Sequence, residues 1–215
     1  MQFFLMLKLM LNFSGIITSQ LYEKSPKMDT QLSVKLRLKL LHVARKSLEN
    51  FLGNGNHIPF RTEIPELLEK RAVFVTLRKM ENGELRGCIG QYKPLYPLIE
   101  AVAKTAISSA VDDIRFPTLT IDELPDLLIE INVLSSMEPS KPESVKIGEH
   151  GLMIKKGLKG SLFLPEVAVS NDWDLYTFLD ELCLKAELPK GSWKDHKTEL
   201  YVFKSEAWGE HEIPS

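Results

Sequence analysis

The chain has 215 residues, a formal net charge of −2 and 44% hydrophobic residues. These values are typical of a globular protein with one large domain or two small lobes, and they do not indicate an overall polyanion-binding surface. The two cysteines, Cys88 and Cys183, lie far apart in the sequence and do not form the framework of a small secreted protein. We therefore expect a reducing, cytoplasmic environment.

The N-terminal 28 residues differ in character from the rest. Met1 to Leu11 is apolar apart from Gln2 and Lys8. A signal peptide carries basic residues before its apolar run, and this run is too short to span a bilayer as a plain helix. We interpret 1–28 as an N-terminal extension packed as a short helix or strand, with a signal or anchor as the alternative. No membrane partner is expected.

Helices are predicted where apolar residues recur at helical spacing. The predicted ranges are 32–52, 98–111 and 173–188, with single helical turns at 65–70 and 121–124. In the first of these helices, Leu38 is expected on the inward face and Gly53 is expected to end the helix.

Strands are predicted where β-branched and aromatic residues gather. The predicted ranges are 72–77, 84–91, 127–134 and 199–204, and the stretch 145–169 is predicted as strands between glycine turns, at 145–147, 151–155 and 161–164. Asn82-Gly83 predicts a hairpin turn between the first two strands. Because strands outnumber helices and tight turns join them, the fold class is α+β with mostly antiparallel sheet.

The segment Leu85–Gly90 carries the strongest candidate site. In an extended strand, Arg86 and Cys88 project from the same face, and a guanidinium beside a thiol favours a lowered cysteine pKa. Gly87 and Gly90 leave room for a ligand or another backbone to approach. The competing interpretation of Cys88 is a buried structural thiol, and that of Arg86 is an ion pair across the sheet.

Other candidates are weaker. His150, in a glycine-flanked turn, is the histidine best placed in the sequence to move a proton. Arg115 either binds an anion or holds its own loop, and Cys183 is expected in the core. No paired-cysteine or two-histidine pattern predicts a metal, and a mixed site of Cys88, His150 and Glu166 is the alternative. We expect no cofactor, because the glycine spacings match no nucleotide-binding motif.

Several motifs follow one another in an order that resembles the AMMECR family, named after the Alport syndrome, mental retardation, midface hypoplasia and elliptocytosis chromosomal region. The resemblance runs from about Leu38 to Glu210. The motifs are Val73–Leu77, Leu85–Gly90, Arg115-Phe116, Gly148-x-His150-Gly151-Leu152, Leu164-Pro165-x-Val167-Ala168, and Trp173 with the helix to Cys183.

The resemblance implies two α+β lobes, with a large lobe from 29–70 and 140–212 and a smaller one, 71–139, inserted in it. It transfers no catalytic residue. Three residues depart from the family pattern: Glu166 replaces glutamine, Ile114 replaces proline, and Glu187 replaces glycine. A carboxylate at 166 would oppose a thiolate nearby unless an arginine paired with it.

Three hypotheses of function follow. The first is a thiol-dependent enzyme in a groove between the lobes, acting on an anionic nucleotide or RNA-related substrate, with Cys88 and His150 as catalytic residues. Its substrate-binding residues would be Arg86, Gly87, Gly90, Arg115 and Glu166. The second is a non-catalytic binding module for a peptide, nucleotide or RNA end. The third is a scaffold subunit, and a homodimer remains open.

Overall fold

The computed structural model describes residues 31–212, so the predicted extension over 1–28 lies outside the described residues. Within this range, contacts divide the chain into two units, one of 31–135 with 206–212 and one of 136–205. Each unit contains a four-stranded sheet with helices, and the strand pairs described are antiparallel. The α+β class is confirmed. Among these residues, no helix is long and apolar enough to cross a membrane.

The units divide the chain differently from the lobes that the resemblance implied. Residues 31–70, expected with 140–212, group instead with 71–135. The physical reason is that the first helix shares one hydrophobic core with the hairpin strands, and Trp208, near the C-terminus, lies in the same core. The unit 136–205 has a separate core.

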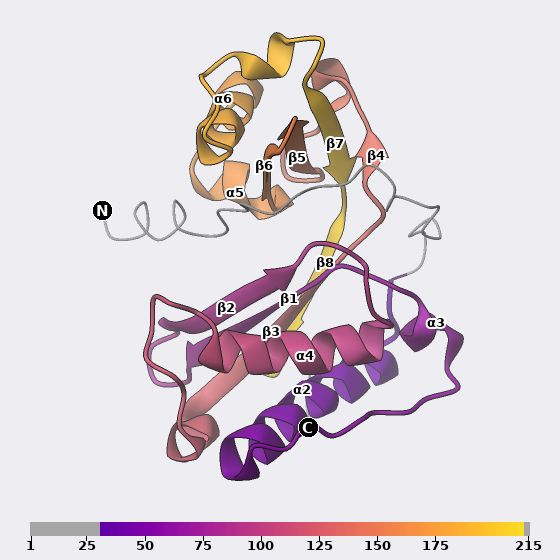
Figure 1. Cartoon of the computed structure of the whole chain (residues 1–215), viewed down its shortest axis with the longest axis vertical. Helices are drawn as coiled ribbons and strands as arrows, with labels where there is room; N and C mark the ends of the chain where they lie inside the picture. The colour runs from indigo at the N-terminus through magenta and orange to yellow at the C-terminus, as the bar shows by residue number, and fades with distance from the viewer. Residues whose placement is uncertain (1–30, 213–215) are drawn as a thin grey trace. The chain divides into compact units, whose positions relative to one another are not determined.

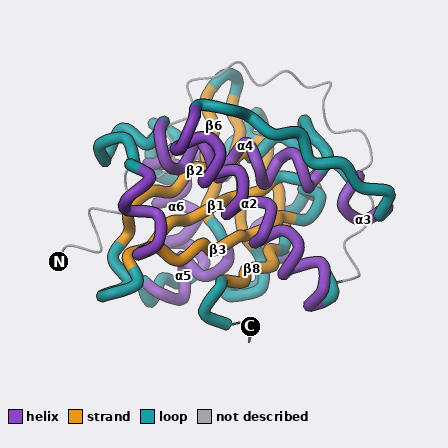
Figure 2. The backbone as a smooth tube through the Cα atoms, turned by 90° about the horizontal axis from the view of Figure 1, so that it is seen from below, coloured by secondary structure: helices purple, strands orange, loops and turns teal. Residues whose placement is uncertain are grey.

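The unit of 31–135 and 206–212 has the sheet order β2-β1-β3-β8, and α2 and α4 cover one face of this sheet (Figures 1 and 2). Its helices are α2 (Val34–Asn54), α3 (Pro65–Leu68), α4 (Leu98–Val111) and the 3-10 helix η1 (Ile121–Asp126). Its strands are β1 (Val73–Lys79), β2 (Leu85–Gln91), β3 (Leu127–Leu134) and β8 (Ser205–Gly209). Strand β8 was not predicted.

Helix α2 ends later than expected, and one of its apolar positions, Leu38, is exposed. Gly55, at φ 73°, caps the helix, and its N–H donates to the Phe51 carbonyl at 2.8 Å. A left-handed residue after the last turn is the usual helix stop, and glycine adopts it without strain. Leu36 and Leu40 are buried, whereas Leu38 is 42% exposed, so the expected inward position of Leu38 is wrong.

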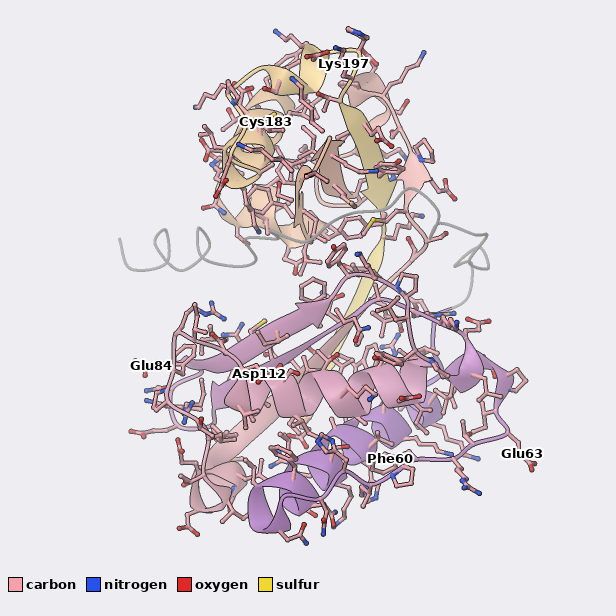
Figure 3. The ribbon with its side chains drawn as sticks, viewed as in Figure 1. Phe60, Glu63, Glu84, Asp112, Cys183 and Lys197 are labelled. Carbon is pink, nitrogen blue, oxygen red and sulfur yellow. The ribbon has the colours of Figure 1, made fainter. Side chains whose placement is uncertain are left out.

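The unit of 136–205 has the sheet order β4-β7-β5-β6, with α5 and α6 against β5 and β6. Its strands are β4 (Glu138–Pro139), β5 (Gly151–Lys156), β6 (Lys159–Phe163) and β7 (Glu199–Phe203). Its helices are α5 (Pro165–Ser170), α6 (Leu175–Lys185) and the 3-10 helices η2 (Pro142–Ser144) and η3 (Ser192–Lys194). Cys183, labelled on α6 in Figure 3, is fully buried in this core, as predicted.

The predicted strand at 145–147 is wrong, and a helix that was not predicted ends the stretch of 145–169. Residues 145–147 form a turn, in which the Lys146 carbonyl accepts from the N–H groups of Glu149 and His150 instead of joining a ladder. Residues 165–169 are helical, because Pro165 stands at the start of α5, where its missing N–H costs nothing.

Candidate functional site

Strand β2 carries the Arg-Gly-Cys segment and lies at the end of its sheet, paired with β1 alone. The hairpin turn before it contains Gly83 at φ 69° and ends at Glu84, labelled in Figure 3. The chain between α4 and β3, which begins at Asp112, supplies the partners of Arg86 and Cys88 described below. We call residues 112–117 the edge loop.

Arg86 is buried and binds only groups of its own fold. Its Nε and Nη2 donate to the two carboxylate oxygens of Glu123 at 2.8 and 3.1 Å, and its Nη1 donates to the Pro117 carbonyl at 3.0 Å. This is the forked geometry in which a guanidinium binds a carboxylate most strongly. The hydrogen bond from Arg86, helped by those from Thr120, lowers the pKa of Glu123 to about 2 against the opposing effect of burial.

Glu123 also fixes the 3-10 helix that carries it. Its carboxylate accepts from the N–H of Thr120 at 3.0 Å and from the Thr120 hydroxyl at 3.2 Å, forming a capping box at the start of η1. Arg86 therefore joins β2 to the beginning of η1 through one carboxylate.

The Cys88 thiol is 8% exposed and receives a hydrogen bond from the Thr76 hydroxyl at 3.3 Å. Burial raises the pKa of this thiol, because the desolvation of a thiolate outweighs the Thr76 hydrogen bond and the positive charge of Arg115. The expected lowering of the Cys88 pKa beside Arg86 is wrong, because burial of the thiol raises its pKa instead.

The main chain of Cys88 is bound by an ion pair from the edge loop. Its N–H donates to Asp113 Oδ2 at 2.8 Å, and its carbonyl accepts from Arg115 Nη2 at 3.2 Å. Arg115 also binds both carboxylate oxygens of Asp113, at 2.8 and 2.6 Å. Although burial opposes it, these hydrogen bonds lower the pKa of Asp113.

Both glycines of the segment are explained by packing. A Cβ atom at Gly87 would lie 2.1 Å from the carbonyl oxygen of Ser109, so α4 approaches the strand where only glycine fits. A Cβ atom at Gly90 would lie 1.9 Å from the Phe74 ring. The room that we expected at these positions is filled by another backbone and by a side chain of the same unit.

His150 and Glu166 belong to the unit of 136–205. The Nδ1 atom of His150 accepts from the N–H of Lys146 at 3.2 Å and closes the turn before β5. Glu166 is exposed in the first turn of α5.

The geometry shows what the Arg-Gly-Cys segment contacts within its own unit. We call Arg86, Asp113, Arg115 and Glu123 the loop clamp, because they join β2 to the chain between α4 and β3. Each guanidinium of the clamp binds a carboxylate, and Asp113 and Arg115 bind the main chain of a residue whose thiol is buried. In residues 31–212, no three histidine, cysteine or acidic side chains are grouped to hold a metal ion.

Asp113 and Glu123 were missed as partners of the segment. Their signal in the sequence is slight: Asp113 lies two residues before Arg115, and Glu123 lies three residues after Thr120, at capping-box spacing. Neither spacing indicates which strand the acid will reach.

The structure thus defines an α+β protein with two antiparallel sheets, and an edge strand bound by two ion pairs. The model of the AMMECR1 family matches residues 41–208. The protein PH0010 of Pyrococcus horikoshii is 42% identical over 185 residues, covering 81% of this chain and 89% of its own. The protein MK0488 of Methanopyrus kandleri is 40% identical, covering 80% and 87%. The chain belongs to the AMMECR1 family.

A solved structure gives the same assignment. The crystal structure of the uncharacterized protein PH0010 from Pyrococcus horikoshii matches with a TM-score of 0.73 and 41% identity, covering 80% of this chain and 90% of that one.

Proposed function

We propose that this chain is a non-catalytic binding module, in which the loop clamp holds the edge loop in one conformation and presents Ile114 to an apolar pocket of a partner protein. The observation that carries the proposal is the exposure of Ile114, which is 96% exposed between two residues of the clamp. Isolated exposed apolar residues are common, but this one stands on a segment fixed at both of its neighbours.

The fixation of the loop supports a recognition role. Asp113 and Arg115, on either side of Ile114, bind each other and the main chain of Cys88. Arg86 binds the Pro117 carbonyl at the other end of the edge loop. A loop that is already ordered loses little conformational entropy on binding, which favours affinity for a given contact area. Central apolar anchors contribute most of the binding energy of many interfaces.

The thiol-enzyme hypothesis has less support. A nucleophilic cysteine needs an accessible thiolate, whereas Cys88 is buried and its pKa is raised. An anionic substrate at Arg86 would have to displace Glu123, which binds the guanidinium through two carboxylate oxygens. At Arg115, Asp113 binds Nε and Nη2, and the remaining Nη1 atom is buried. Exchanging one paired carboxylate for another anion gives little net affinity.

The test is site-specific crosslinking in the full chain. Ile114 is replaced by the photo-crosslinking residue p-benzoylphenylalanine, and Leu158 is replaced likewise as the matched control. Leu158 is 66% exposed in the turn between β5 and β6. We expect a discrete crosslinked protein from position 114 and none from position 158.

Competition distinguishes the two hypotheses. Excess unlabelled wild-type chain and the Cys88→Ser variant should both suppress the crosslink, whereas Ile114→Asp should not. Equal products from both positions, or equal competition by Ile114→Asp, would overturn the proposal. Failure of Cys88→Ser to compete, despite a native fold, would favour a role for the thiol.

A further inference from the structure

The N–H and C=O groups of Cys88 point away from the rest of its sheet. Thr76 and Cys88 are opposite each other in the β1–β2 ladder, and their side chains meet at 3.3 Å. Close side chains mark the non-hydrogen-bonded pair of an antiparallel ladder. The N–H and C=O groups of such a residue point to the side away from its partner strand, and no strand in residues 31–212 lies on that side of β2.

The edge loop satisfies these two groups with side chains. Asp113 accepts from the Cys88 N–H at 2.8 Å, and Arg115 donates to the Cys88 carbonyl at 3.2 Å. These are the two hydrogen bonds that the main chain of a further strand would make with this residue. Because a carboxylate and a guanidinium make them, the ladder ends here instead of continuing.

The next outward-pointing residue of β2 is Gly90, opposite Phe74. Gly90 is partly exposed, and its N–H and C=O groups point the same way as those of Cys88, since direction repeats every second residue. A sheet edge that no further strand pairs with is a template for a strand of another chain.

We propose that the Asp113–Arg115 pair is an edge cap, which prevents a second copy of this chain from adding its β2 strand to β2. The second copy is the natural occupant, because antiparallel pairing of β2 with itself uses the same surface on both chains and closes as a dimer. Buried charged groups beside an edge are among the devices by which natural sheets avoid such pairing.

The test uses the full chain with both side chains of the cap removed, in the variant Asp113→Ala/Arg115→Ala. The matched control is Arg78→Ala/Glu130→Ala, which removes an ion pair of 2.8 Å between β1 and β3 of the same sheet. It also removes the Arg78 bond to the Gly83 carbonyl, but it keeps both side chains that bind the main chain of Cys88. Mass is measured by light scattering from micromolar to near-millimolar concentration, and exchange of the Cys88 amide is followed by NMR.

We expect the cap variant to shift with concentration toward twice the mass of the wild-type assembly, while the control keeps the wild-type mass. In the cap variant, the Cys88 amide should exchange faster than in the wild type at low concentration and regain protection at high concentration. A mass equal to that of the control at every concentration would overturn the proposal, as would assembly without renewed protection of Cys88.

A second variant covers the case in which the double variant does not fold, as judged by circular dichroism. Arg115→Met removes only the donor to the Cys88 carbonyl and keeps the Asp113 bond to the Cys88 N–H. We expect a smaller shift in mass in the same direction. A folded Arg115→Met chain with wild-type mass throughout would then overturn the proposal.

Discussion

Arg86 on β2 binds both carboxylate oxygens of Glu123 on η1, at 2.8 and 3.1 Å, although 37 residues separate them in the chain. The guanidinium is 8% exposed and the carboxylate 40% exposed, so the pair reaches from the interior to the surface. This contact assigns Arg86 to holding the chain between α4 and β3.

Glu123 makes the stability of the fold depend on pH. Its pKa of about 2 lies below the ordinary 4.5, so the stability it contributes is present above pH 4.5 and is lost as the pH falls toward 2. Glu123→Gln should lower the free energy of unfolding at pH 7 by about 1 kcal/mol, a value discounted for solvent screening of this partly exposed group. Urea unfolding at pH 7 and pH 3 checks this. An equal difference at both pH values would contradict the assignment.

Gly87 is required by the close approach of α4. Gly87→Ala should destabilise the chain by about 3 kcal/mol, because the added Cβ meets the carbonyl of Ser109, which belongs to the helix backbone and cannot turn away. The control is Gly53→Ala, in α2, where a Cβ meets nothing within 4 Å. That change should stabilise the chain by up to about 1 kcal/mol. Thermal unfolding measures both, and a tolerated alanine at 87 would refute the packing explanation.

The sequence allowed most of the elements to be predicted, because periodicity and turn residues are local signals. Leu98–Val111 and Leu127–Leu134 were predicted with the bounds that the structure has, and Asn82-Gly83 was identified as the hairpin turn. Strand β8 could not be found in this way: it is five residues long, and its place beside β3 depends on a contact between distant parts of the chain.

The candidate site was predicted less well than the fold. The side-by-side placement of Arg86 and Cys88 follows from strand geometry, but the partners that decide their chemistry do not. Glu123 and Asp113 reach β2 from 37 and 25 residues away, and no spacing rule connects them to it. Burial of the thiol, which reverses the expected direction of its pKa, likewise depends on packing across the whole unit.

The forked geometry of Arg86 should matter more than its charge. Arg86→Lys keeps the charge but cannot reproduce two parallel bonds to Glu123 together with one to the Pro117 carbonyl. We expect amides of the edge loop to exchange about tenfold faster or more, corresponding to a loss of about 1.4 kcal/mol. The control Arg78→Lys changes a more exposed pair on the sheet face and should leave edge-loop exchange unchanged. Equal acceleration in both variants would argue against a clamp.

A substitution at Ile114 should weaken binding to the partner without changing the stability of the fold. Because its side chain is 96% exposed, Ile114→Ser should change the free energy of unfolding by less than about 0.5 kcal/mol. The same substitution should abolish competition for the crosslinked partner. Chemical unfolding and the crosslinking assay are run on one preparation, and a large loss of stability would mean that Ile114 packs against the fold rather than a partner.

The central claim is that the Arg-Gly-Cys segment is a structural anchor for the edge loop, and its most direct test is the pH dependence of iodoacetamide labelling at Cys88. Cys183, fully buried on α6, is the internal control, and mass spectrometry separates the two sites. Because burial raises the pKa of both thiols, we predict slow labelling of the native chain near neutral pH and rapid labelling of both on unfolding. Selective labelling of native Cys88 at pH 7, with an apparent pKa below about 8.5, would contradict the account.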